Sequence, residues 1–136
     1  MKIRSKFLAV FILTAAPLSA QEFTARNGVT VAAVGKGFNV TGDAGIGARG
    51  VWCGAADYAR SVKGATGAQR LYIAEDRKRG FGQRGPVTFT LDPNGLTPSS
   101  TVIVGGSLGR AGANLSVGHA FGFCADHKLQ RAGGRF

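Results

Sequence analysis

Alternating apolar and polar positions predict strands along most of the chain after residue 20. The cleanest alternation is at residues 87–91, where valine, phenylalanine and leucine would point inward and two threonines outward. A glycine and a lysine at 35–36 separate two short runs of this kind and predict the tight turn of a β-hairpin. Residues 100–104 end in three successive apolar residues, which indicates a largely buried strand. Strands are therefore expected at 29–34, 37–41, 70–75, 87–91 and 100–104.

Helical spacing predicts one helix, at residues 52–62. Alanine is frequent in this segment, Cys53 and Ala56 fall on one face, and Gly64 ends the pattern. Asp57 lies in the middle of this segment and is expected to be a solvated residue of the helix surface.

Residues 114–126 fit either a strand or a helix. As a strand they place Leu115, Phe121 and Phe123 on one face, opposite a face of small residues. As a helix they begin at Ser116, whose hydroxyl is a favourable N-cap. Two interior glycines would each cost a helix about 1 kcal/mol, which favours the strand.

About six strands and one helix predict an α+β fold with a mainly antiparallel sheet. The chain of 136 residues has room for one domain of ordinary size. We expect a single small domain at residues 21–128, and a flexible C-terminal tail at 129–136.

The first twenty residues have the pattern of a secretory signal peptide. Lys2, Arg4 and Lys6 precede an apolar stretch at 7–15, and small residues up to Ala20 offer a cleavage site. The apolar stretch is shorter than the ~20 residues that a transmembrane helix needs, so no span is expected. The pattern predicts a periplasmic or secreted protein. Removal of residues 1–20 takes away three basic residues and no acidic one, and lowers the net charge from +10 to +7.

The two cysteines, Cys53 and Cys124, are expected to form a disulfide, because the periplasm and the extracellular space are oxidising. The bridge would close a loop of about 70 residues and join the predicted helix to the sheet. The alternative is a zinc site in which His119 and His127 complete a Cys₂His₂ ligand set. The disulfide is favoured, and no metal or other cofactor is expected.

The most distinctive segment is basic and joins two predicted strands at 75–85. Arg77, Lys78, Arg79 and Arg84 surround Phe81 there. Basic side chains around an exposed aromatic ring suit an anionic polymer or a lipid headgroup, whereas a specific nucleic-acid partner is not expected. The alternative is a solvated hairpin tip with the phenylalanine packed back onto the domain.

Two glycine motifs have catalytic or ligand-binding counterparts. Residues 105–109 match G-x-S-x-G, so a small hydrolase could use Ser107 with His119 as its base. Asp126 and His127 are adjacent and would face opposite ways on a strand, which leaves no carboxylate to orient a histidine. Residues 45–50 match G-x-G-x-x-G, and Arg49 could help to hold an anion at the start of the helix. In a chain with 22 glycines, plain loops and turns are the favoured interpretation of both motifs.

Three stretches together resemble a group of small uncharacterised exported proteins of Gram-negative bacteria: VWCGAADYA at 51–59, VTFTLDP at 87–93, and NLSVGHA with a following FC at 114–124. The resemblance implies export and the two-cysteine framework, and it implies no activity or site residues. The leading hypothesis is a non-enzymatic domain that binds an anionic envelope component through its basic segment. The alternatives are the small hydrolase, and an interaction module or inhibitor that uses an exposed sheet edge.

Overall fold

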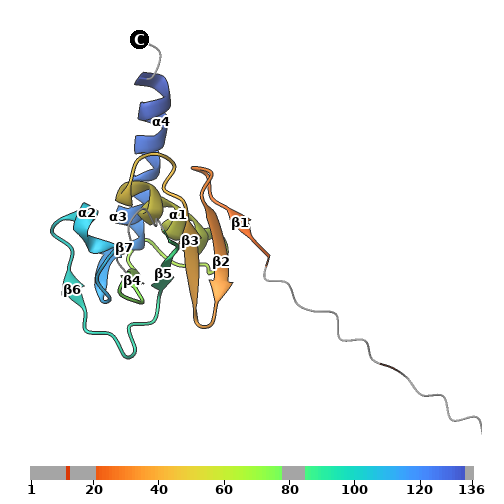
Figure 1. Cartoon of the computed structure of the whole chain (residues 1–136), viewed down its shortest axis with the longest axis vertical. Coiled ribbons are helices and arrows are strands. Elements are labelled where there is room, and N and C mark those ends of the chain that lie inside the picture. The colour runs from red at the N-terminus through yellow and green to blue at the C-terminus, as the bar shows by residue number, and fades with distance from the viewer. Residues whose placement is uncertain (1–11, 13–20, 78–84, 134–136) are drawn as a thin grey trace, which may run out of the picture.

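The computed structural model describes residues 12, 21–77 and 85–133, in which seven strands form one sheet (Figure 1). The strand order is β1-β2-β3-β5-β4-β7-β6, with β6 and β1 at opposite edges. The strands are β1 (Phe23–Thr24), β2 (Thr30–Val34), β3 (Gly37–Thr41), β4 (Arg70–Ile73), β5 (Val87–Thr90), β6 (Ser99–Ser100) and β7 (Ala113–Ser116). The helices are α1 (Ala48–Ser61), α2 (Val104–Ser107), α3 (Val117–Gly122) and α4 (Cys124–Gly133). The predicted α+β class is confirmed, with one strand more than expected.

The register of the central strands separates an apolar face of the sheet from a polar one. Phe38 of β3 lies opposite Phe89 of β5, which in turn lies opposite Ile73 of β4, and all three are buried. Since successive side chains point to opposite faces, the neighbouring pair Asn39 and Thr88 lies on the other face, where the threonine hydroxyl donates to the asparagine Oδ1 across 2.7 Å. The alternation predicted for 87–91 is confirmed from Val87 to Phe89. Thr90, expected to point outward, is buried, and Leu91, expected to point inward, is half-buried beyond the end of β5.

Helix α1 covers the apolar face through small residues. Every residue from Gly50 to Ala59 is buried. A Cβ at Gly54 would overlap a methyl group of Val29, so glycine lets the helix approach β2 closely. The Trp52 ring meets Phe89 edge to face at a centroid distance of 5.0 Å. The helix predicted at 52–62 is confirmed, and it begins four residues earlier.

The strand expected at 114–126 is wrong after Ser116. Strand β7 ends there, and the chain continues as α3 and α4. The Ser116 side chain accepts a hydrogen bond from the backbone N–H of His119 across 3.1 Å, so the helical alternative had the correct N-cap. Gly118 lies in a close contact: its N–H donates to the Gly67 carbonyl at 2.9 Å, and a Cβ there would lie 3.2 Å from that oxygen, closer than an ordinary van der Waals contact. A tertiary contact thus outweighs the low helix propensity of glycine.

Two further segments differ from the prediction. The strand expected at 100–104 ends at Ser100, and Val102 and Ile103 are 88% and 75% exposed instead of buried. The short strand β6 pairs in parallel with β7, so the sheet is mixed. The chain expected to become a tail at 129 remains helical to Gly133 in α4, which extends away from the sheet (Figure 1).

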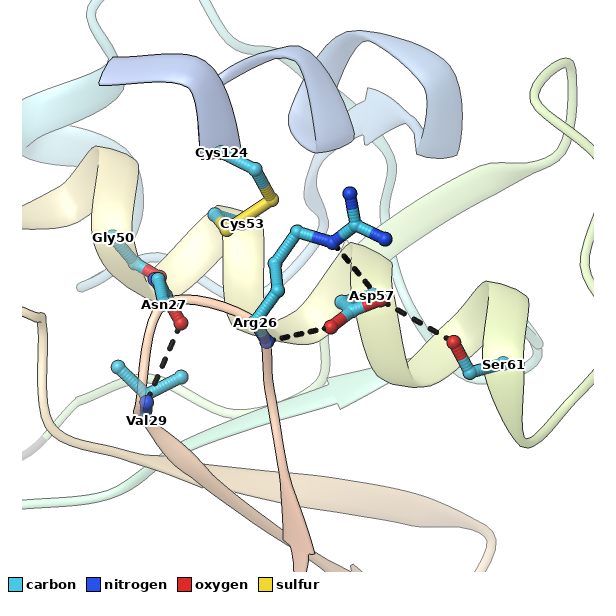
Figure 2. Close-up of a disulfide and its surroundings, with 8 residues drawn as sticks. All are labelled: Arg26, Asn27, Val29, Gly50, Cys53, Asp57, Ser61 and Cys124. Atoms are coloured by element: carbon cyan, nitrogen blue, oxygen red, sulfur yellow. Dashed lines mark hydrogen bonds and ion pairs between the residues drawn. A yellow bond between two sulfur atoms is a disulfide. The ribbon is translucent and has the colours of Figure 1, made fainter. Parts of the chain in front are cut away.

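The predicted disulfide between Cys53 and Cys124 is confirmed, with a Cα–Cα distance of 5.0 Å. It joins α1 to the first residue of α4, so it links two helices and not a helix to the sheet (Figure 2). Both cysteines are buried. The bridge therefore holds the C-terminal helices against the helix that covers the core.

Asp57 is buried, in contrast to the solvated position expected for it. Its carboxylate accepts hydrogen bonds from the Arg26 backbone N–H at 2.8 Å and the Ser61 hydroxyl at 3.3 Å (Figure 2). The Arg26 Nε lies 3.7 Å from the same carboxylate. Asp57 therefore ties the chain between β1 and β2 to α1, which no local sequence pattern indicates.

Candidate functional site

The predicted basic segment joins two neighbouring antiparallel strands. Strand β4 ends at Ile73 and β5 begins at Val87, and the two strands pair with each other. Arg77 is described by the structure, whereas Lys78, Arg79, Phe81 and Arg84 lie outside the described residues. The site is therefore built from Arg77 and the elements around it.

The two ends of the basic segment are held together by hydrogen bonds. The Arg77 Nη2 donates to the carbonyl of Gly85 across 2.9 Å. The Ala74 N–H donates to the carbonyl of Thr88 at 2.8 Å and extends the β4–β5 pairing toward the segment. On the other side, Asp76 accepts a hydrogen bond from the Ala111 N–H at 2.7 Å. These contacts anchor the chain on which the basic residues are carried.

Arg77 and Gly85 line a groove of about 290 Å³, which we call the Arg77 groove. Its other lining residues are mainly glycines and apolar side chains, among them Val51 of α1 and Leu108 next to α2, and it also includes Asp43. The Arg77 Nε is buried and has no hydrogen-bond partner among the described residues. The groove thus combines apolar walls with a guanidinium group, one donor of which is buried without a partner among the described residues.

The Arg77 charge is not neutralised by an ion pair within the described ranges. The two ion pairs found there join Arg26 to Asp57 and Arg49 to Asp126. An arginine outside an ion pair can bind an anion without first breaking one, and its planar donors match phosphate and carboxylate oxygens. Asp43 adds one carboxylate to the lining of the same groove. The Arg77 groove can therefore bind the charged group of an anion that also has an apolar part.

Ser107 is placed in the core and not at an open active site. It is 1% exposed, it donates a hydrogen bond to the Val104 carbonyl at 2.6 Å, and it accepts one from the Trp52 indole N–H at 2.9 Å. His119 lies exposed on α3, with its ring 5.3 Å from that of Phe123. The structure describes no hydrogen bond between the two proposed hydrolase residues.

The sulfur atoms proposed as zinc ligands are joined to each other. Cys53 and Cys124 form the disulfide, so neither offers a thiolate beside His119 or His127. In the part of the chain that the structure describes, no three histidine, cysteine or acidic side chains are grouped closely enough to hold a metal ion.

The G-x-G-x-x-G segment has a packing role. Gly47 is the N-cap of α1 with a φ of 66°, and a Cβ at Gly50 would overlap the backbone oxygen of Asp43. Arg49 points to the C-terminal helix, where its Nη1 lies 3.0 Å from Asp126 Oδ2. Strand β5 separates β3 from β4, the strand that follows α1, and pairs antiparallel with both. Within the described residues, the directly paired parallel strands of a dinucleotide-binding β-α-β unit are therefore not formed.

One surface cluster was missed by the sequence analysis. The Phe121 ring lies between two guanidinium groups, 4.6 Å from that of Arg26 and 3.9 Å from that of Arg60. Such cation–π contacts contribute about 0.5–1 kcal/mol at exposed sites. The three residues come from separate parts of the chain, so no spacing rule could have found them.

Within the described ranges, no helix has the combination of length and apolar character that crossing a membrane requires. Comparison of the chain with family models, with curated proteins and with solved structures finds no match. The function is therefore inferred from the geometry of the chain itself.

Proposed function

We propose that the protein is an exported, non-enzymatic domain that binds an anionic component of the bacterial envelope, either an anionic polymer or a lipid headgroup, at the Arg77 groove. One observation carries this proposal: Arg77 both closes the base of the basic segment and lines an apolar-walled groove without a carboxylate partner among the described residues. Arg77 therefore belongs both to the groove and to the start of the basic segment.

Two features support export to the periplasm or beyond. Residues 1–20 have the pattern of a signal peptide. The disulfide between Cys53 and Cys124 needs an oxidising compartment in which to form and persist. Anionic lipids, lipopolysaccharide phosphates and acidic polysaccharides are the polyanions that an exported protein meets there.

The chemistry of the groove favours an anion with an apolar part. The guanidinium group of Arg77 can donate paired hydrogen bonds to a phosphate, and the valine and leucine walls accept an adjoining apolar group. The net charge of the chain is +7 after removal of residues 1–20, and it attracts polyanions over about 10 Å at moderate salt. Binding is therefore expected to weaken steeply as salt is added.

Co-sedimentation with lipid vesicles tests the proposal. We expect the oxidised protein to bind vesicles that contain phosphatidylglycerol, and not vesicles of phosphatidylcholine alone. The triple variant Arg77→Ala, Arg79→Ala and Arg84→Ala should lose this binding.

A control triple variant removes the same charge from exposed positions away from the groove: Lys36→Ala, Lys63→Ala and Lys128→Ala. It should retain most of the binding. An equal loss in both triple variants would show that net charge alone drives association, and would reject a site at the Arg77 groove. A parallel titration with lipopolysaccharide identifies the polymer as the ligand if vesicles do not bind.

A further inference from the structure

Arg70, the first residue of β4, is held in place by a neutral side chain. Asn114 of β7 donates through its Nδ2 to the carbonyls of Ser99 and Gly112, both at 3.0 Å. This orientation leaves Oδ1 to accept from Arg70, whose Nε and Nη2 lie 3.0 and 2.7 Å away. Because Asn114 is buried, the guanidinium group is fixed on a rigid support at the polar face of the sheet.

The positive charge of Arg70 is not compensated. Neither ion pair of the described residues includes it, and its Nη1 donates no hydrogen bond within the described ranges. The hydrogen bonds to Asn114 join β4 to β7 through Arg70, but the neutral amide of Asn114 does not offset the positive charge of the arginine. The fixed guanidinium can therefore bind an anion without first breaking an ion pair.

Arg70 lines an open groove of about 460 Å³ between β4, β6, β7 and α3, which we call the Arg70 groove. Ser99, Thr101 and His119 also line it, and no acidic residue does. The hydroxyl oxygens of Ser99 and Thr101 are buried and have no hydrogen-bond partner among the described residues. A buried hydroxyl without a partner destabilises the fold. Each can turn to another staggered rotamer and donate to a ligand without losing an existing bond.

We propose that the Arg70 groove is a second binding site, which takes a small oxyanion: a carboxylate or a phosphate group. Arg70 supplies the charge and the fixed donors, the hydroxyls of Ser99 and Thr101 supply further donors, and His119 lies at the same groove. The site is separate from the Arg77 groove, because Arg70 begins β4 whereas Arg77 follows the opposite end of that strand. Either site can fail without the other.

An NMR titration of the oxidised protein tests this site. Inorganic phosphate, and separately acetate, is added at constant ionic strength made up with chloride. We expect saturable shifts of the backbone amides of Ser99, Thr101 and Asn114. Arg70→Gln should weaken binding at least tenfold, whereas Arg110→Gln, the same change at another exposed arginine, should leave it unchanged. Arg70→Lys keeps the charge without the planar donors and should bind with intermediate affinity.

Variants of Ser99 and Thr101 separate a binding role of their hydroxyls from a structural one, because phosphate affinity and stability are measured independently. Ser99→Ala and Thr101→Val should weaken phosphate binding a few-fold while the unfolding midpoint is unchanged or raised, because each removes an unsatisfied buried group. Shifts that do not saturate, or that persist in Arg70→Gln, would overturn the proposal. Vesicles with phosphate headgroups that shift the same amides identify a lipid as the source of the anion, and shifts with soluble phosphate alone identify a free anion.

Discussion

The indole nitrogen of Trp52 donates a hydrogen bond to the hydroxyl of Ser107 across 2.9 Å in the core. The serine hydroxyl in turn donates a hydrogen bond to the carbonyl of Val104 across 2.6 Å. The two residues are 55 positions apart and join α1 to α2. Ser107, the serine of the G-x-S-x-G motif, thus accepts the hydrogen bond of Trp52, the only tryptophan in the sequence.

Replacing Ser107 with alanine should therefore lower stability. The Trp52 N–H would remain buried without a partner, at a cost of about 1–3 kcal/mol in the free energy of unfolding. Urea denaturation followed by tryptophan fluorescence measures this change directly. A fluorophosphonate probe should leave Ser107 of the native protein unlabelled, and labelling that is lost in Ser107→Ala would revive the hydrolase hypothesis.

Breaking the bridge between Cys53 and Cys124 should cost about 2–5 kcal/mol, because it closes a loop across 71 positions and restricts the unfolded chain. Urea denaturation with and without reductant gives the difference. The double variant Cys53→Ala and Cys124→Ala is the control, since its stability should not respond to reductant. Equal stability of the oxidised and reduced wild type would contradict a structural role for the bridge.

Gly50 and Gly122 should respond in opposite ways to alanine. A Cβ at Gly50 would overlap the Asp43 carbonyl oxygen, so α1 would have to move away from the preceding loop. Gly122 ends α3 with open space around it, and alanine there should stabilise the helix by about 0.5–1 kcal/mol. Thermal unfolding of both variants compares the two effects. A Gly50→Ala protein as stable as the wild type would argue against the packing role.

Ile103 and Ile73 provide a matched test of the revised segment at 100–104. Ile103 is 75% exposed, so Ile103→Ala should change the free energy of unfolding by no more than about 0.5 kcal/mol. Ile73 is fully buried, and Ile73→Ala should cost about 2–5 kcal/mol. Urea titrations measure both. A large loss in Ile103→Ala would restore the buried strand that the apolar pattern predicted.

Part of the candidate site was visible in the sequence. The basic residues between β4 and β5 stand out by composition. Arg77 lies between two strands, as the sequence predicts, and the structure adds that these strands pair with each other. The groove beside it was not predictable, since its walls come from Val51, Leu108 and other residues far apart in the chain. The Arg70 groove was not predicted from the sequence, because it depends on the orientation of the Asn114 side-chain amide, which the carbonyls of Ser99 and Gly112 fix.

The sequence by itself determined those elements whose signal is local. The β2–β3 hairpin follows from a glycine turn with φ of 54° at Gly35 between two short runs. Strand β5 follows from the alternation at 87–89 on a sheet with one apolar and one polar face. Helix α1 follows from its small residues at helical spacing. The cysteine pairing follows from there being two cysteines in a chain whose first twenty residues have the pattern of an export signal.

Tertiary structure decided the segments in which local preference was weak or opposed. Two glycines predicted that no helix would follow Ser116. The chain is nevertheless helical there: Gly118 of α3 makes a close contact with Gly67, and the disulfide at Cys124 joins α4 to α1. The apolar residues Val102 and Ile103 predicted burial, yet the edge strand ends before them. Asp57 was predicted to be solvated, but the chain near Arg26 covers it and donates a hydrogen bond to its carboxylate. For the helix and for Asp57, contacts between residues distant in sequence outweigh the preference of the segment itself.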